Sequence, residues 1–84
     1  MSRFYFHAEN GGAHRDEEGL ELHTLAEARR QAARVLGELL KERPDAIWAD
    51  GGLKLTVTDD RDLTLFALEV AATVAPAGGP PPRP

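Results

Sequence analysis

Residues 24–43 read TLAEARRQAARVLGELLKER, and this stretch decides how the rest of the chain can fold. The spacing of Thr24 and Glu27 predicts a capping box, in which the hydroxyl accepts from the Glu27 amide and the carboxylate reaches back to the helix start. Pro44 disfavours helical geometry in the residue before it, so we expect the helix to end at residues 42–43.

The two faces of this helix differ in polarity, as in an amphipathic helix. The apolar positions are Leu25, Ala28, Ala32, Val35, Leu36, Leu39 and Leu40. The polar positions are Glu27, Arg30, Gln31, Arg34, Glu38 and Lys41. We expect the apolar face, including Leu36 and Leu39, to be buried.

The residues before the helix predict a hairpin. Arg3–Ala8 alternates like a strand, and Asn10-Gly11-Gly12 favours a tight turn because asparagine and glycine tolerate positive φ. Ala13–Asp16 is then the returning strand, residues 16–19 form an acidic turn, and residues 20–22 are a linker. One face of the first strand carries Phe4, Phe6 and Ala8, and the other carries Tyr5 and His7.

The residues after the helix predict a second hairpin. Pro44–Gly52 is a connector, in which Ile47 and Trp48 are expected to close one end of the core. Leu53–Thr58 alternates like a half-buried strand, and residues 59–62 form a turn.

The segment that follows the turn is apolar on both faces if it is a strand. We favour a strand over Leu63–Val70 because it continues from a hairpin-type turn. A helix over residues 66–74 is the alternative, since Phe66, Val70 and Val74 also fit helical spacing.

These elements predict an α+β fold in the order β-β-α-β-β. The expected architecture is a four-stranded, largely antiparallel sheet with one helix packed on one face, formed by a single domain over residues 1–74. Residues 75–84 hold five of the six prolines and few large apolar side chains. We expect them to be a disordered tail.

The composition narrows the class of protein. Fourteen acidic against ten basic residues give a formal net charge of −4, which disfavours binding to nucleic acid. The chain has no cysteine, so disulfides and thiolate metal sites are excluded. No apolar run has the length of a signal segment or a membrane span, and we expect a soluble, cytoplasmic protein.

Three sequence features carry a family resemblance. They are the opening Arg3-Phe4-Tyr5-Phe6-His7, the turn Asp16-Glu17-Glu18-Gly19, and Val57-Thr58-Asp59-Asp60 before the second turn. With these features, residues 3–70 resemble a small bacterial domain family of unknown function. The resemblance implies no activity, because none is established for that family. The chain departs from the pattern at Arg61-Asp62, where the family usually has glycine.

A weaker likeness rests on the order of the elements. Hairpin, acidic turn, capping box and alanine-rich helix follow one another in a way that resembles the N-terminal half of HicB-type antitoxins. Those proteins usually append a DNA-binding module, and we expect none here.

His7 and His14 are the strongest candidates for metal ligands. With a two- or four-residue loop they would lie directly opposite each other and share a face with Tyr5 and Asp16. Two imidazoles and a carboxylate could hold a divalent metal. A solvated hairpin face is the simpler interpretation, because no supporting partners can be named. We therefore predict no metal and no cofactor.

The other reactive side chains do not predict an enzyme. Residues 16–18 lie in an exposed turn, where burial cannot separate the pKa values of paired carboxylates. Asp59, Asp60 and Asp62 lack the later glycine and the distal glutamate of a calcium loop. Ser2 is the only serine, and no glycine-rich phosphate loop joins a strand to a helix.

The sheet face away from the helix is the predicted interaction surface. The residues assigned to it are Tyr5, His7, Thr56, Leu65, Phe66 and Leu68. An exposed patch of this kind usually meets a partner. We therefore expect a non-enzymatic protein-interaction module that binds another protein or forms a homodimer. The alternative is an antitoxin-like regulator that binds a basic toxin or acts in RNA or DNA control.

Overall fold

The structure is a computed structural model that describes residues 1–9 and 12–78. Two helices and five strands follow one another in the chain, with a short 3-10 turn after the last strand. Their order is β1 Ser2–Glu9, β2 Ala13–His14, β3 Leu20–Leu22, α1 Leu25–Glu42, α2 Pro44–Asp50, β4 Gly52–Thr58, β5 Thr64–Ala71 and the turn Pro76–Gly78.

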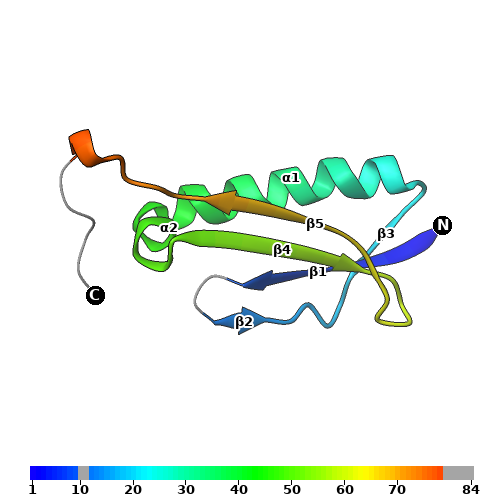
Figure 1. Ribbon diagram of the computed structural model, residues 1–84. Helices are drawn as coiled ribbons and strands as arrows, with labels where there is room; N and C mark the ends of the chain where they lie inside the picture. Colours follow the sequence, from blue (N-terminus) through cyan, green and yellow to red (C-terminus); the bar gives the residue numbers. More distant parts are fainter. Residues whose placement is uncertain (10–11, 79–84) are drawn as a thin grey trace.

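The strands form one antiparallel sheet in the order β2-β1-β4-β5, with β3 also paired to β1. Figure 1 shows α1 running along one side of this sheet, with α2 at one end. The predicted α+β fold is confirmed. The helical alternative for residues 66–74 is wrong, because β5 continues as a strand to Ala71.

Thr24 and Glu27 start α1 as the capping box predicts. The Thr24 hydroxyl accepts from the Glu27 amide, and the Glu27 carboxylate accepts from the His23 amide, both at 3.1 Å. The α1 helix ends at Glu42, and the next helix, α2, begins at Pro44. Both ends of α1 are therefore fixed by local residues.

Two segments differ from the sequence prediction. The linker over residues 20–22 is a strand, β3, which pairs antiparallel with Ser2–Phe4. The connector contains a seven-residue helix, α2, with proline in its first turn and Gly51 as its C-cap at φ 79°. Proline at the start and glycine at the end are themselves helix signals, so this helix could have been recognised from the sequence.

The core lies between α1 and the sheet. Ala28, Ala32 and Leu36 are buried on the helix side, while Leu25 remains 40% exposed. The residues that complete the buried core are Phe4, Ala8, Ile47, Leu53, Leu55 and Val57. Ile47 closes one end of the core as expected, but Trp48 is 54% exposed and does not.

The strand registers decide which side chains share a face of the sheet. Leu55 is paired with Ala8 on one side and with Leu68 on the other, and Val57 is paired with Phe6 and Phe66. Paired residues of an antiparallel sheet lie on the same face, so this row faces α1. The opposite face, here called the open face, carries Tyr5, His7, Glu9, Lys54, Thr56, Thr58, Ala67 and Glu69.

Within the described residues, neither helix has the length and apolarity that a membrane crossing requires. The expected tail begins with the turn Pro76–Gly78, and residues 79–84 lie outside the described part of the chain.

Candidate functional site

Asp16 joins the segment between β2 and β3 to the middle of β1. Its carboxylate accepts the backbone N–H of Phe6 through Oδ2, and those of Glu18 and Gly19 through Oδ1, each at 3.1 Å. The sequence prediction treated Asp16–Gly19 as a solvated acidic turn. In the structure, Asp16 is instead a partly buried acceptor that holds this segment against the sheet.

The backbone hydrogen bonds set the protonation of Asp16. Burial alone would raise the pKa of this carboxyl, but the hydrogen bonds from the amides of Gly19, Phe6 and Glu18 hold it below the ordinary value of 3.8. A carboxylate that accepts several backbone N–H bonds is stabilised in its charged form. Asp16 is therefore an ionised structural acceptor at neutral pH.

His7 lies between Asp16 and Thr58 on the open face. Its Nδ1 accepts from the backbone N–H of Asp16 at 3.1 Å, and its Nε2 lies 3.0 Å from the Thr58 hydroxyl. Because a backbone amide can only donate, Nδ1 must carry the lone pair, and Nε2–H of the neutral ring donates to Thr58. The Tyr5 ring stacks beside it, with centroids 6.5 Å apart and planes 4° from parallel.

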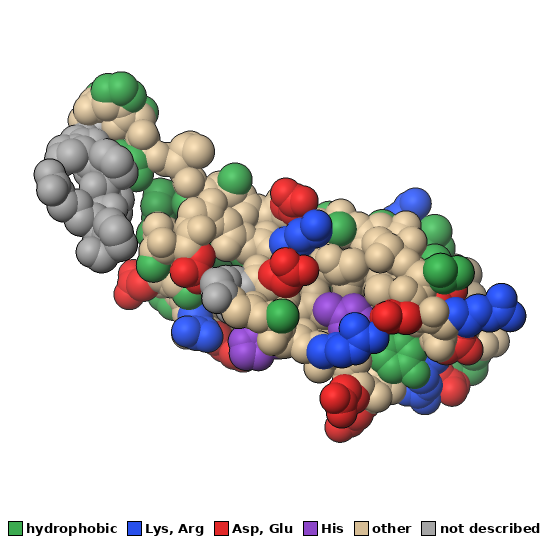
Figure 2. Space-filling view, turned by 60° about the horizontal axis from the view of Figure 1, so that its bottom comes forward, with side chains coloured by type: hydrophobic (Ala, Val, Ile, Leu, Met, Phe, Trp, Pro, Cys, Tyr) green, Lys and Arg blue, Asp and Glu red, His purple; other side chains and the backbone are tan. Residues whose placement is uncertain are grey.

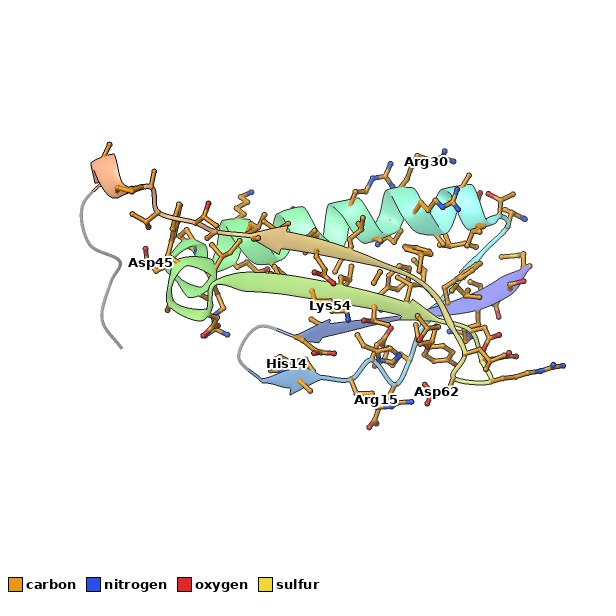
Figure 3. All side chains as sticks on the ribbon, in the orientation of Figure 1. His14, Arg15, Arg30, Asp45, Lys54 and Asp62 are labelled. Carbon is orange, nitrogen blue, oxygen red and sulfur yellow. The ribbon has the colours of Figure 1, made fainter. Side chains whose placement is uncertain are left out.

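A hollow of about 240 Å³ lies over these residues. Arg15 and Asp62 close one side of it with an ion pair of 2.6 Å that joins the end of β2 to the β4–β5 turn. Figure 3 shows these two side chains next to each other below the sheet. Thr58, on the open face, lines this hollow and is only 5% exposed. The residues that line it are Tyr5, His7, Arg15, Asp16, Glu17, Thr58, Asp59, Asp60 and Asp62.

The proposed pairing of His7 with His14 is wrong. His14 lies opposite Ala8 in the β1–β2 register, so it belongs to the other face of the sheet. In the part of the chain that the structure describes, no three histidine, aspartate or glutamate side chains are grouped closely enough to hold a metal ion. His7 and Asp16 are brought together, but each is engaged with the backbone or with Thr58.

Residues 61–62, where the family usually has glycine, lie in the β4–β5 turn. Asp62 adopts a φ of 65°, in the left-handed region that favours glycine. The Asp59 carboxylate accepts from the amides of Arg61 and Leu63 at 2.8 and 3.0 Å and holds the loop in place. Asp59 and Asp62 therefore stabilise the conformation of this turn. Comparing the sequence with the pattern of a calcium loop could not reveal this role.

The predicted interaction surface is divided between two faces. Tyr5, His7 and Thr56 lie on the open face, as expected. Phe66 and Leu68 do not, because their register with Val57 and Leu55 turns them toward α1, where they pack partly buried against the core. Leu65 sits at an irregularity of the β4–β5 pairing and is 41% exposed. The open face is consequently more polar than the sequence predicted.

Figure 2 shows acidic and basic side chains interspersed over the visible face, without an extended area of one charge. Lys54 and Glu69 contribute one such mixed pair, with Nζ and Oε1 3.9 Å apart.

The outer edges of the sheet, one at β1 and one at β5, differ in how they are occupied. On the β1 side, β2 and β3 pair with opposite ends of β1, and Asp16 occupies the interval between them. On the other side, β5 is the last strand of the sheet and presents eight consecutive residues, TLFALEVA, with one charge among them. Natural edge strands are usually shortened, charged or covered to prevent pairing with another chain. β5 is long, and the devices that it carries within the described residues are one acid, Glu69, and the irregularity of its pairing at Leu65.

The family comparison agrees with the resemblance seen in the sequence. The model of the family described as Domain of unknown function (DUF6894) matches residues 3–71, and the chain belongs to this family. No curated protein and no solved structure matches the chain significantly. The likeness to HicB-type antitoxins therefore stays a hypothesis.

Proposed function

We propose that this chain is a non-enzymatic protein-interaction module whose docking element is the free edge of β5. The observation that carries the proposal is the contrast between the two edges of the sheet. Asp16 and two short strands interrupt the outer edge of β1, whereas β5 offers a longer edge whose pairing with β4 is regular from Phe66 to Ala71. Extended segments add to such an edge through main-chain hydrogen bonds, and alternate side chains supply the specificity.

The hollow beside His7 supports a structural role for its residues over a catalytic one. Both ring nitrogens of His7 are engaged, and the Asp16 carboxylate already accepts three amides. A general base or a metal ligand needs a lone pair that is free for the substrate or the metal. Using His7 in that way would break its bond to the Asp16 amide or to Thr58, and the Asp16 carboxylate keeps at most one acceptor position beyond its three amides.

Affinity capture followed by hydrogen exchange tests the proposal. A tagged chain is produced in its own cells together with the untagged chain, and the captured complex is compared with the purified chain. We expect amides of residues 64–71 that exchange quickly in the purified chain to be protected in the complex. Amides of β1 near Asp16 serve as the internal control and should not change. Protection confined to another surface would rule out β5 as the docking element.

An antitoxin-like regulator is the second candidate. The acidic residues around the hollow favour a basic partner, and three of them, Glu17, Asp59 and Asp60, lie on its rim. Salt distinguishes the two candidates, because exposed charge pairs are screened while apolar strand pairing is not. A partner that leaves the captured chain when the salt concentration is raised to about 1 M would favour the acidic rim.

A further inference from the structure

We propose that the partner bound at the β5 edge is a second copy of this chain, paired antiparallel through β5 about a two-fold axis. This inference rests on the proposed function, since it assigns the occupant of the same edge. The strand carries the apolar side chains Phe66, Leu68 and Val70, which face α1 and remain only partly buried in one chain. A neighbouring strand with the same pattern would continue this row.

Symmetry restricts how two copies can meet. A two-fold axis that pairs two antiparallel edges must stand perpendicular to the sheet, so both copies of α1 lie on the same side. Side chains that face α1 in one copy then lie opposite side chains that face α1 in the other copy. The sequence around Leu68 suits this arrangement, because Phe66 and Val70 are equally spaced on either side of it. With Leu68 on the axis, Phe66 lies opposite Val70 of the second copy.

The single charge of β5 selects the same register. With Leu68 on the axis, Glu69 lies opposite Ala67 of the second copy and keeps Lys54 of its own chain as its neighbour. Placing Glu69 on the axis would set two like charges directly opposite each other, which is destabilising. Placing Ala67 on the axis would bring the irregular residue Leu65 next to the centre of the pairing.

A second copy suits this edge because the apolar row Phe66, Leu68 and Val70 then meets itself, while Glu69 does not meet the Glu69 of the other copy. The paired edges alone are smaller than the roughly 1,600 Å² of a standard interface. We therefore expect a dimer that dissociates on dilution, in the range of about 1–100 μM that weak interfaces occupy.

Two substitutions of the same exposed residue test the register by the sign of the charge. Ala67→Glu puts a second acid opposite Glu69 of the other copy, and Ala67→Lys puts a base there. Light scattering at several concentrations should show a dimer for the wild type and a tighter one for Ala67→Lys. Ala67→Glu should raise the dissociation constant by about tenfold, and Ala67→Glu combined with Glu69→Lys should restore it. Circular dichroism checks that each variant is folded.

Cysteine cross-linking tests which residue lies on the axis. The chain has no cysteine, so each single variant reports on one position. Leu68→Cys should form a disulfide-linked dimer under mild oxidation, while Phe66→Cys and Val70→Cys should do so only when mixed with each other. Efficient cross-linking of Ala67→Cys or Glu69→Cys with itself would overturn the register.

The outcomes separate this inference from the proposed function. A mass near 9.1 kDa at every concentration would overturn the dimer. If another protein then protected residues 64–71, β5 would still be the docking element. A dimer that leaves those residues unprotected would overturn this inference, and it would contradict the proposed function as well if no captured partner protected them.

Discussion

The carboxylate of Asp16 accepts the backbone N–H of Phe6 at 3.1 Å, across the interval between β2 and β3. One side chain thereby satisfies a strand amide that has neither β2 nor β3 beside it. The same carboxylate also orders the turn that leads into β3. The acidic turn of this family is thus, in this chain, a device that closes one edge of the sheet.

Removing the Asp16 carboxylate is expected to destabilise the fold. Asp16→Ala leaves three backbone donors without their acceptor, and should lower the free energy of unfolding by about 1–3 kcal/mol. Urea denaturation followed by circular dichroism measures the change. Glu17→Ala is the matched control, because Glu17 is exposed and should alter stability by less than about 0.5 kcal/mol. Equal effects of the two substitutions would remove Asp16 from its structural role.

The lowered pKa of Asp16 predicts a specific dependence of stability on pH. A carboxyl whose pKa is lower in the folded state contributes stability above its ordinary pKa of 3.8 and loses it as the pH falls through the folded value. The stability difference between wild type and Asp16→Asn should therefore be constant near pH 7 and shrink below about pH 4. Urea midpoints measured from pH 7 to pH 2 test this. A difference that grows on acidification would contradict the sign of the shift.

The hydrogen bonds of His7 predict its neutral tautomer. Since Nδ1 accepts from Asp16 and Nε2 points at Thr58, the neutral ring should carry its proton on Nε2. Nitrogen-15 chemical shifts of the imidazole at alkaline pH distinguish the two tautomers. His14 and His23, which are exposed, serve as references within the same spectrum. A proton found on Nδ1 would mean that the bond to the Asp16 amide is not formed.

Two glycine substitutions should have opposite effects. Gly19 has a φ of 69°, and an added Cβ would lie 2.9 Å from both Arg3 Cγ and Tyr5 Cε2. Gly19→Ala should therefore cost about 1–3 kcal/mol. Gly37 lies in the middle of α1 with nothing within 4 Å of the added atom, so Gly37→Ala should stabilise by about 0.5–1 kcal/mol. Thermal unfolding of both variants gives the comparison, and a neutral Gly19→Ala would show that the turn can relax.

The packing of α1 predicts different effects for a second matched pair of substitutions. Leu36 is 7% exposed and Leu25 is 40% exposed on the same helix. Leu36→Ala should cost about 2–4 kcal/mol, as a large-to-small change in a core does, and Leu25→Ala should cost clearly less. Denaturant unfolding measures both. If Leu25→Ala is the more damaging, the buried face of α1 is assigned incorrectly.

The sequence by itself determined the elements whose signals lie within a few residues. The capping residues Thr24 and Glu27 and the apolar spacing up to Leu40 predicted α1, alternation predicted β1 and β4, and the preceding hairpin-type turn predicted β5. These features depend on backbone geometry and on side-chain periodicity, which neighbouring residues carry between them. The α2 helix was also signalled locally, by Pro44 and Gly51, although it was not predicted.

Only the tertiary structure decided how the strands pair. The pairing in turn decides which residues lie on each face of the sheet. A shift of one residue turns every side chain of a strand to the other face, and nothing within a strand states its register. The opposition of Ala8 to His14 therefore ruled out the histidine pair, and the pairing of Phe66 with Val57 and of Leu68 with Leu55 turned these two side chains toward α1. The reach of Asp16 to Phe6 depends on the path of the nine residues between them. Contacts between residues this far apart depend on how all the strands pair, so no short stretch of sequence predicts them.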